Sequence, residues 1–425
     1  MKSTDEDQAN PPRSRVALDI GSTVIKVARL DSQDGLLSQH FFARDFVAGI
    51  ERQVASVLAQ LDVVIGRDTV LGCSSANGGL RVGIVGLSQH YSCTAFRNQV
   101  LLAGANPIFV HDLDACPGDP RRVDILLVGG GIDCADALPM EQRLLAFDPS
   151  RYRYDALVYA GNRHLADAFL RRHADARVIS NPLGETLSSR VGSVFDAVRC
   201  AYLDDLVLKE GLRQLPPSLA RSIRPTPEVA SRGFLRSVMN QSTFEIFGPC
   251  LMLDIGGATT DLHYTVELVS DDSPARPASG VSVARYVFTD LGIVASRDTL
   301  LLQLRNHPQL YEFLAVVSGA NVREVYAGLR EGEHEPTPTQ LAYACLFIAL
   351  DRFRLGNGPG LPVGQVAQAA QIILTGGAVQ TLDEKIVGRI VALLAPSGGP
   401  PPLVQIDRRY EIWVAGISWS GDHAE

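Results

Sequence analysis

The chain has 425 residues, 46% of them hydrophobic and 20% charged, which is the balance of a folded protein with room for more than one core. Its formal net charge of −8 argues against nucleic acid as a main partner, because such binding needs a basic surface. No apolar run approaches the roughly 20 residues of a membrane-spanning helix, and the seven cysteines include no CxxC pair. We therefore expect a cytoplasmic protein with no membrane partner, no disulfide framework and no cysteine-bound zinc.

The first expected fold element follows a polar, acidic stretch at residues 1–14, which we interpret as a disordered tail rather than a signal peptide. It is an apolar strand that ends in Asp19, turns through Gly21 and continues in the hydroxyls of Ser22 and Thr23. A glycine at such a turn lets the backbone approach a phosphate closely and leaves N–H groups free to donate to it. This hairpin is therefore a candidate phosphate site.

Beyond an amphipathic helix at about 47–61 and a strand at 80–87, the pattern changes to short strands that alternate with helix-length segments. This alternation predicts an inserted α/β unit with a parallel sheet at about 106–185. Its Gly129–Asp133 loop lacks the Gly-x-Gly-x-x-Gly spacing of a dinucleotide site, so we interpret it as a loop at a strand end. A partner-facing role for this loop stays open.

The sequence pattern of the first hairpin recurs near the middle of the chain, where an apolar run ends in Asp254 and turns through Gly256 and Gly257. Thr259, Thr260 and Asp261 complete it. Either copy alone is equally well explained as a buried strand followed by a glycine turn. Two copies predict related half-molecules that face each other across a phosphate chain. Because carboxylates repel phosphate, the two strand-end Asp residues make sense with a cation between them, and Mg²⁺ prefers such oxygen ligands.

A third element follows at Ile372–Val379, where an apolar strand runs into Gly376 and Gly377. Such a junction can admit the sugar and base of a nucleotide against bare backbone. The order of hairpin, hairpin and strand-Gly-Gly resembles the actin, sugar kinase and Hsp70 superfamily. Within it, the chain resembles the glutamate mutase accessory family, called GlmL or MutL. The stretches that carry this narrower resemblance are Asp19–Thr23, Cys73–Arg81, Val85–Leu87, Thr94–Asn106, Tyr159–Asn162, Arg224–Pro227 and Asp254–His263.

The resemblance implies an α/β fold with two ribonuclease-H-like lobes around an ATP cleft. The first lobe would span 15–247, with the inserted α/β unit and its connecting helices, and the second 248–425. The MutL label is shared with a mismatch-repair protein, but this chain shows none of that protein's ATPase signature. It also lacks the histidine that the family resemblance leads us to expect near Asp351–Arg354.

The resemblance also implies roles for individual residues. Asp19 and Asp254 would hold Mg²⁺ through water, and Gly376 and Gly377 would admit the adenosine of ATP. Asp261 would either orient the attacking water or brace the turn, with bracing slightly favoured. The phosphates would be cradled by Gly21, Ser22, Thr23, Gly256, Gly257 and Thr259, with Thr260 closing the second hairpin.

Two nearby side chains have less specific interpretations. Lys26 is a candidate phosphate contact, but strand alternation from Thr23 places it on the opposite face, where a solvated or lobe-bracing lysine fits as well. His263 follows a buried strand and is more simply explained as a structural residue.

The function implied by the resemblance is that of an ATP-dependent reactivating chaperone, an ATPase, for an adenosylcobalamin-dependent mutase such as glutamate mutase. Lobe movement driven by Mg-ATP would exchange damaged cofactor in that partner. The cobalamin would belong to the partner, because no Asp-x-His-x-x-Gly motif occurs in this chain. Two alternatives stay open: a small-molecule kinase of the same superfamily, and a scaffold that binds ATP without hydrolysing it.

Overall fold

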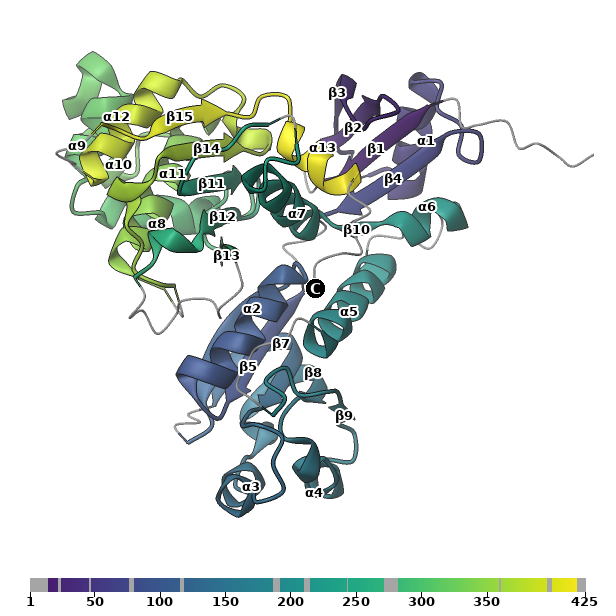
Figure 1. Cartoon of the computed structure of the whole chain (residues 1–425). Coiled ribbons are helices and arrows are strands. Elements are labelled where there is room, and N and C mark those ends of the chain that lie inside the picture. Colours follow the sequence, from purple (N-terminus) through teal and green to yellow (C-terminus); the bar gives the residue numbers. More distant parts are fainter. Residues whose placement is uncertain are drawn as a thin grey trace, which may run out of the picture.

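The computed structural model describes residues 14–21, 24–45, 47–75, 80–114, 118–185, 192–209, 215–242, 244–270, 282–358, 361–395 and 400–418. In this part of the chain there are three five-stranded sheets, each with its own helices. Two of the resulting bodies lie side by side and the third extends below them (Figure 1). The predicted α/β class, with two lobes and an inserted unit, is confirmed.

The first sheet has the order β10-β4-β1-β2-β3. Strands β1 and β2 form an antiparallel hairpin, β3 extends it, and β4 and β10 add in parallel on the other side. Helix α1, the predicted amphipathic helix, packs its apolar face on this sheet. The elements are β1 (Arg15–Ile20), β2 (Val24–Leu30), β3 (Leu36–Ala43), α1 (Ile50–Gln60), β4 (Thr69–Ser74), α6 (Pro217–Ser222) and β10 (Arg224–Pro225).

The second sheet repeats this arrangement in the order β13-β12-β11-β14-β15, again with a hairpin first and parallel strands on the other side. Both sheets therefore have the strand order of a ribonuclease-H-like lobe. Helix α11 is buried along most of its length, as its apolar sequence predicts. The elements are β11 (Cys250–Ile255), β12 (Thr260–Thr265), β13 (Val283–Phe288), α8 (Arg297–Asn306), α9 (Leu310–Val317), α10 (Val322–Glu331), α11 (Pro338–Leu355), β14 (Gln371–Thr375), α12 (Glu384–Leu394) and β15 (Leu403–Ile406).

The third sheet, of the inserted unit, is fully parallel in the order β6-β5-β7-β8-β9. It includes β5, which starts at residue 81 and so precedes the predicted start of the insert at about 106. Sequence periodicity identified this strand but not the sheet to which it belongs. A strand that is buried on both faces has the same apolar sequence in the lobe sheet as in the sheet of the insert. The elements are β5 (Arg81–Gly86), a π-helix (Gln89–Cys93), α2 (Thr94–Leu102), β6 (Asn106–Asp112), β7 (Asp119–Gly129), α3 (Leu138–Leu145), β8 (Tyr152–Tyr159), α4 (Ala166–Arg172), β9 (Arg177–Val178) and α5 (Ser193–Lys209).

The insert is packed firmly on the first lobe. One hydrophobic cluster runs without a break from Val16 and Leu18 of β1 to Phe96 of α2, Ile84 of β5 and Val198 of α5. The orientation of the insert is therefore set by a shared core, and a displacement of α2 or α5 would change the packing in both units.

Two helices, α7 (Thr226–Val238) and α13 (Glu411–Ser418), lie between the two lobe sheets (Figure 1). They cross where each has a glycine: a Cβ at Gly233 would lie 1.8 Å from the carbonyl oxygen of Ile412, and one at Gly416 would lie 1.9 Å from that of Val229. Although the chain enters α13 from the second lobe, the indole of Trp413 packs with first-lobe strand residues. No helix in the described ranges is long and apolar enough to cross a membrane.

Candidate functional site

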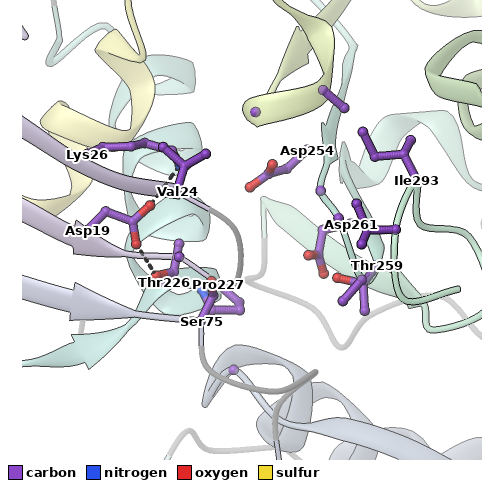
Figure 2. Close-up of a pocket in the computed structure, with 18 of the residues that line it drawn as sticks. Asp19, Val24, Lys26, Ser75, Thr226, Pro227, Asp254, Thr259, Asp261 and Ile293 are labelled. Atoms are coloured by element: carbon purple, nitrogen blue, oxygen red, sulfur yellow. Dashed lines mark hydrogen bonds and ion pairs between the residues drawn. The ribbon is translucent and has the colours of Figure 1, made fainter. Parts of the chain in front are cut away.

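A cavity of about 300 Å³ opens where the two lobes meet the insert. It lies between the β1–β2 and β11–β12 hairpins, and the start of α7 and the turn from α2 to β6 also contribute to its wall. Figure 2 shows Asp19 and Lys26 on one side of it and Asp254, Asp261 and Thr259 on the other. The structure thus brings together three segments that the sequence singled out separately. The predicted site residues in its lining are Asp19, Gly21, Lys26, Asp254, Gly256, Gly257, Thr259, Asp261 and Gly377.

Two other predicted residues, Thr260 and Gly376, are placed differently. Thr260 is buried behind the second hairpin, where its hydroxyl donates to the carbonyl oxygen of Leu291 at 2.8 Å. Gly376 has a φ of +100° and supports the site from behind, since a Cβ there would lie 2.3 Å from Oδ1 of Asp254. Ser22 and Thr23 lie outside the described residues.

The two hairpins are built alike. The Gly21 N–H donates to the carbonyl oxygen of Val24 at 3.0 Å, and the Gly256 N–H donates to that of Thr259 at 2.9 Å. The antiparallel register pairs Asp19 with Lys26 in the first hairpin and Asp254 with Asp261 in the second. The matched positions therefore carry a carboxylate on each first strand, but a cation on one second strand and an anion on the other.

Asp19 is held by three neighbours and is 1% exposed. The ammonium of Lys26 lies 2.7 Å from Oδ2, and the hydroxyl of Thr226 donates to Oδ1 at 2.7 Å. The thiol of Cys73 lies 3.3 Å from the same Oδ1. Burial raises the pKa of this thiol well above its usual value, and the charge of Asp19 adds to the rise, so Cys73 is a neutral hydrogen-bond donor.

Lys26 is on the cavity side of its strand, contrary to the face expected from alternation. Strand β2 begins at Val24, and its register against β1 sets Lys26 directly opposite Asp19. Burial lowers the pKa of Lys26, but Asp19, Tyr410 and Asp254 together raise it above its usual value. The ammonium also lies 4.6 Å from the centroid of the Tyr410 ring. Lys26 is therefore a charged residue that links the first lobe to the segment before α13.

No described residue forms such an ion pair with Asp254. Burial raises its pKa to about 6; Lys26 opposes this rise, and the neighbouring charges of Asp261 and Asp19 add to it. A partly buried carboxylate in this state gains from a bound cation. The described residues contain no group of three or more His, Cys, Asp or Glu that could hold a metal directly. Asp19 and Asp254 both line the cavity, and such oxygen donors suit Mg²⁺ that keeps most of its water and shares a phosphate ligand.

Asp261 is engaged by a residue that the sequence reading missed. The Arg285 guanidinium of β13 donates to Oδ1 of Asp261 from two nitrogens, with Nε at 3.0 Å. This buried pair favours the bracing interpretation of Asp261 over an active role with water. His263 is also structural: its Nδ1 lies 3.4 Å from the Ser231 hydroxyl, and burial, with the charge of Arg285, lowers its pKa well below the usual value.

The backbone around the cavity leaves space for an anionic chain. A Cβ at Gly377 would meet nothing within 4 Å, and at Gly256 the nearest atom would be 3.3 Å away. Bare peptide groups therefore face the cavity from both Gly-rich turns of the second lobe, where they can donate to phosphate. Thr226 and Asn106 also line it. Thr226 and Asn106 belong to stretches that carry the family resemblance but received no role there, and no local pattern pointed to Arg285.

Comparison with known proteins identifies the family. The family model described as MutL protein matches residues 15–416. The chain belongs to the MutL protein family. The curated protein MutL of Clostridium tetanomorphum is similar to this MutL-family chain, at 25% identity over 280 residues. That alignment covers 61% of this chain and 58% of the relative, so it spans less than two thirds of the relative's length.

Solved structures that are similar to the MutL-family chain include the activator of 2-hydroxyisocaproyl-CoA dehydratase from Clostridium difficile with bound ADPNP. It is 8% identical, covers 95% of this chain and 92% of its own, and has a TM-score of 0.34. The ROK hexokinase from Thermus thermophilus is 12% identical, covers 95% and 96%, and has a TM-score of 0.29. The lobe architecture is defined by the chain's own strand order rather than by these scores.

Proposed function

We propose that this MutL-family protein is an ATP-dependent reactivating chaperone of an adenosylcobalamin-dependent mutase, similar to glutamate mutase, and that it exchanges damaged cofactor through lobe movement. The observation that carries the proposal is the pair of matched hairpins. Each ends its first strand in a carboxylate and turns through glycine, and both face one cavity between two lobes of the same strand order. Membership of the MutL family supports the choice of partner.

In this proposal the phosphates of ATP lie between the hairpins. The Gly257 N–H donates to them beside Gly256, whose own N–H closes the turn, and the adenosine lies toward Gly377 and Ala378. A bound Mg²⁺ would neutralise phosphate charge and polarise the terminal phosphoryl group. Asp19 and Asp254 would hold its water shell, and Lys26 keeps Asp19 oriented through their ion pair.

The same structure offers a path for movement. Helices α7 and α13 meet at Gly233 and Gly416 with backbone against backbone, and side chains such as Phe234 and Ile412 pack beside this crossing. The lobes can rotate about such a contact when a ligand draws the two hairpins together. The start of α7 is attached to Asp19 through Thr226, which would connect closure at the hairpins to this crossing.

A reactivation assay tests the proposal. A co-encoded mutase stalled with cofactor that lacks its adenosyl group should regain activity when the chain, Mg-ATP and fresh coenzyme are added. Asp254→Asn should abolish the rescue and the phosphate release. The same substitution at Asp298, an exposed carboxylate on α8, should change neither.

Three results would contradict the proposal or redirect it. Absence of rescue with every co-encoded mutase would refute the chaperone role. A phosphorylated small molecule that accumulates when the protein is supplied with cell extract would support the kinase instead. Tight ATP binding without phosphate release, with or without the mutase, would support the scaffold.

A further inference from the structure

Helix α2 of the insert ends at the cavity. The turn that follows it brings Gly104 and Asn106 into the cavity wall. Gly104 has a φ of +85°, and a Cβ there would lie 2.7 Å from Cβ of Pro225, so this turn is wedged against the start of α7. Figure 1 shows α2 extending from this junction toward the outer part of the insert. The insert therefore contributes directly to the proposed nucleotide site.

Arg285 of the second lobe holds this end of α2. Its Nη1 donates to the carbonyl oxygen of Leu101 at 2.7 Å, while its other nitrogens donate to Asp261. Leu101 lies in the last turn of α2, at the negative end of the helix dipole, and its carbonyl oxygen also accepts from the Gly104 N–H at 3.0 Å. The side chain of Arg285 is 2% exposed and also lines the cavity. One guanidinium thus connects the second lobe, a cavity carboxylate and the insert.

The outer end of α2 is tied as tightly to the sheet of the insert. The π-helix before α2 contains Ser92, and a Cβ at Gly130 would lie 2.7 Å from its Oγ. The Leu87 N–H donates to the carbonyl oxygen of Gly129 at 3.0 Å. Asp133, at the end of the same loop, accepts from the backbone N–H of Arg163 at 2.9 Å. Close packing at Ser92 therefore joins the π-helix before α2 to Gly130, and hydrogen bonds hold the same Gly129–Asp133 loop to the end of β5 and to the segment after β8.

We propose that Arg285 is a positioning residue that couples occupancy of the cavity to the position of α2, and through α2 to the loop at the carboxyl ends of the insert strands. A phosphate entering the cavity competes with the Leu101 carbonyl for the same guanidinium, because both accept from it. A cation beside Asp254 weakens the hold of Asp261 on Arg285. Either event changes the contact between the second lobe and the end of α2 in the insert.

The coupling rests on the proposed function only in that ATP occupies this cavity. The test is amide hydrogen exchange. A merely structural role of Arg285 would not change how exchange in α2 responds to ligand. It is measured for wild type, Arg285→Gln and Arg285→Lys, without ligand and with saturating Mg²⁺ and a non-hydrolysable ATP analogue. Protection of the hairpin segments 19–27 and 254–261 reports occupancy. Arg352→Gln is the matched control, since Arg352 pairs with Asp290 in the same lobe but does not line the cavity.

In wild type and Arg352→Gln, we expect the analogue to change exchange across 94–106 by about five-fold or more, the lower end of usual coupling. In Arg285→Gln the hairpins should still respond at saturation while the response of 94–106 is lost, and Arg285→Lys should fall between, because a lysine cannot span both acceptors as a planar fork does. Unchanged exchange in α11 would show that the variants are folded.

Two outcomes would overturn the coupling, and they are distinguishable from failure of the proposed function. A wild-type response of 94–106 in Arg285→Gln would refute it. So would protection of the hairpins in wild type with no change at 94–106, which leaves the ATP site intact. If the analogue does not change hydrogen exchange in the hairpins of the wild type, ATP binding in this cavity is refuted, and the coupling with it.

Discussion

Replacing Asp254 by Asn should make the ligand-free protein more stable while it destroys the proposed Mg-ATP site. Burial and the neighbouring carboxylates raise the pKa of Asp254 to about 6, so its charged form is disfavoured in the folded protein. Asn keeps the shape of the side chain and removes that charge. Such opposition between stability and function is common where a site is built to bind a charged ligand.

The magnitude follows from the shift in pKa. Between its ordinary 3.8 and about 6 the difference is about 2 units, which at roughly 1.4 kcal/mol per unit gives an upper value of about 3 kcal/mol. Asp254 retains some contact with solvent, so we expect about 1–3 kcal/mol. Because the folded-state pKa is raised, the stability that Asp254 contributes is complete below 3.8 and is lost as the pH rises through about 6.

Thermal unfolding of wild type and Asp254→Asn between pH 5 and pH 8 measures this directly. The advantage of the variant should grow from pH 5 to about pH 7 and then remain constant. Mg-ATP should raise the melting temperature of the wild type and leave that of the variant unchanged. Asp298→Asn, the same change on an exposed carboxylate, should show no pH-dependent difference. Equal melting temperatures for Asp254→Asn and wild type across this range would refute the reasoning.

Three further predictions concern other parts of the structure. Gly416→Ala should lower the free energy of unfolding by about 1–3 kcal/mol, because its Cβ would lie 1.9 Å from a backbone oxygen of α7, whereas Gly388→Ala, where a Cβ meets nothing, should be neutral or stabilising in the same urea titration. Lys26→Met should cost about 3–5 kcal/mol by leaving the Asp beside it buried without its cation, and a melting temperature equal to wild type would contradict this. Maleimide followed by mass spectrometry should label exposed Cys200 well before Cys73, whose thiol is buried and has a raised pKa; equal rates would show that the core around Cys73 opens readily.

Much of the site was predictable from the sequence because its chemistry is local. A strand that ends in Asp and a turn that begins with glycine are written in consecutive residues, and both hairpins form where Asp19–Gly21 and Asp254–Gly257 predict them. The repetition of this Asp-Ile-Gly hairpin pattern also predicted two lobes, which the matching strand orders confirm. The segment of α11 is apolar nearly all round, which is typical of a buried helix, and α11 is buried along most of its length.

The tertiary structure decided what depends on contacts between distant segments. Whether Lys26 faces the cavity follows from the register of β2 against β1, and a shift of one residue reverses the face. Arg285, which also binds Asp261, donates to Leu101, a residue 184 positions away, and no local sequence pattern indicates this contact. Helix α13 packs on the first lobe although the chain reaches it from the second. Turn and strand propensities act within a few residues, so the sequence by itself determined the hairpins, whereas side-chain direction and the joining of the lobes to the insert required packing of the whole chain.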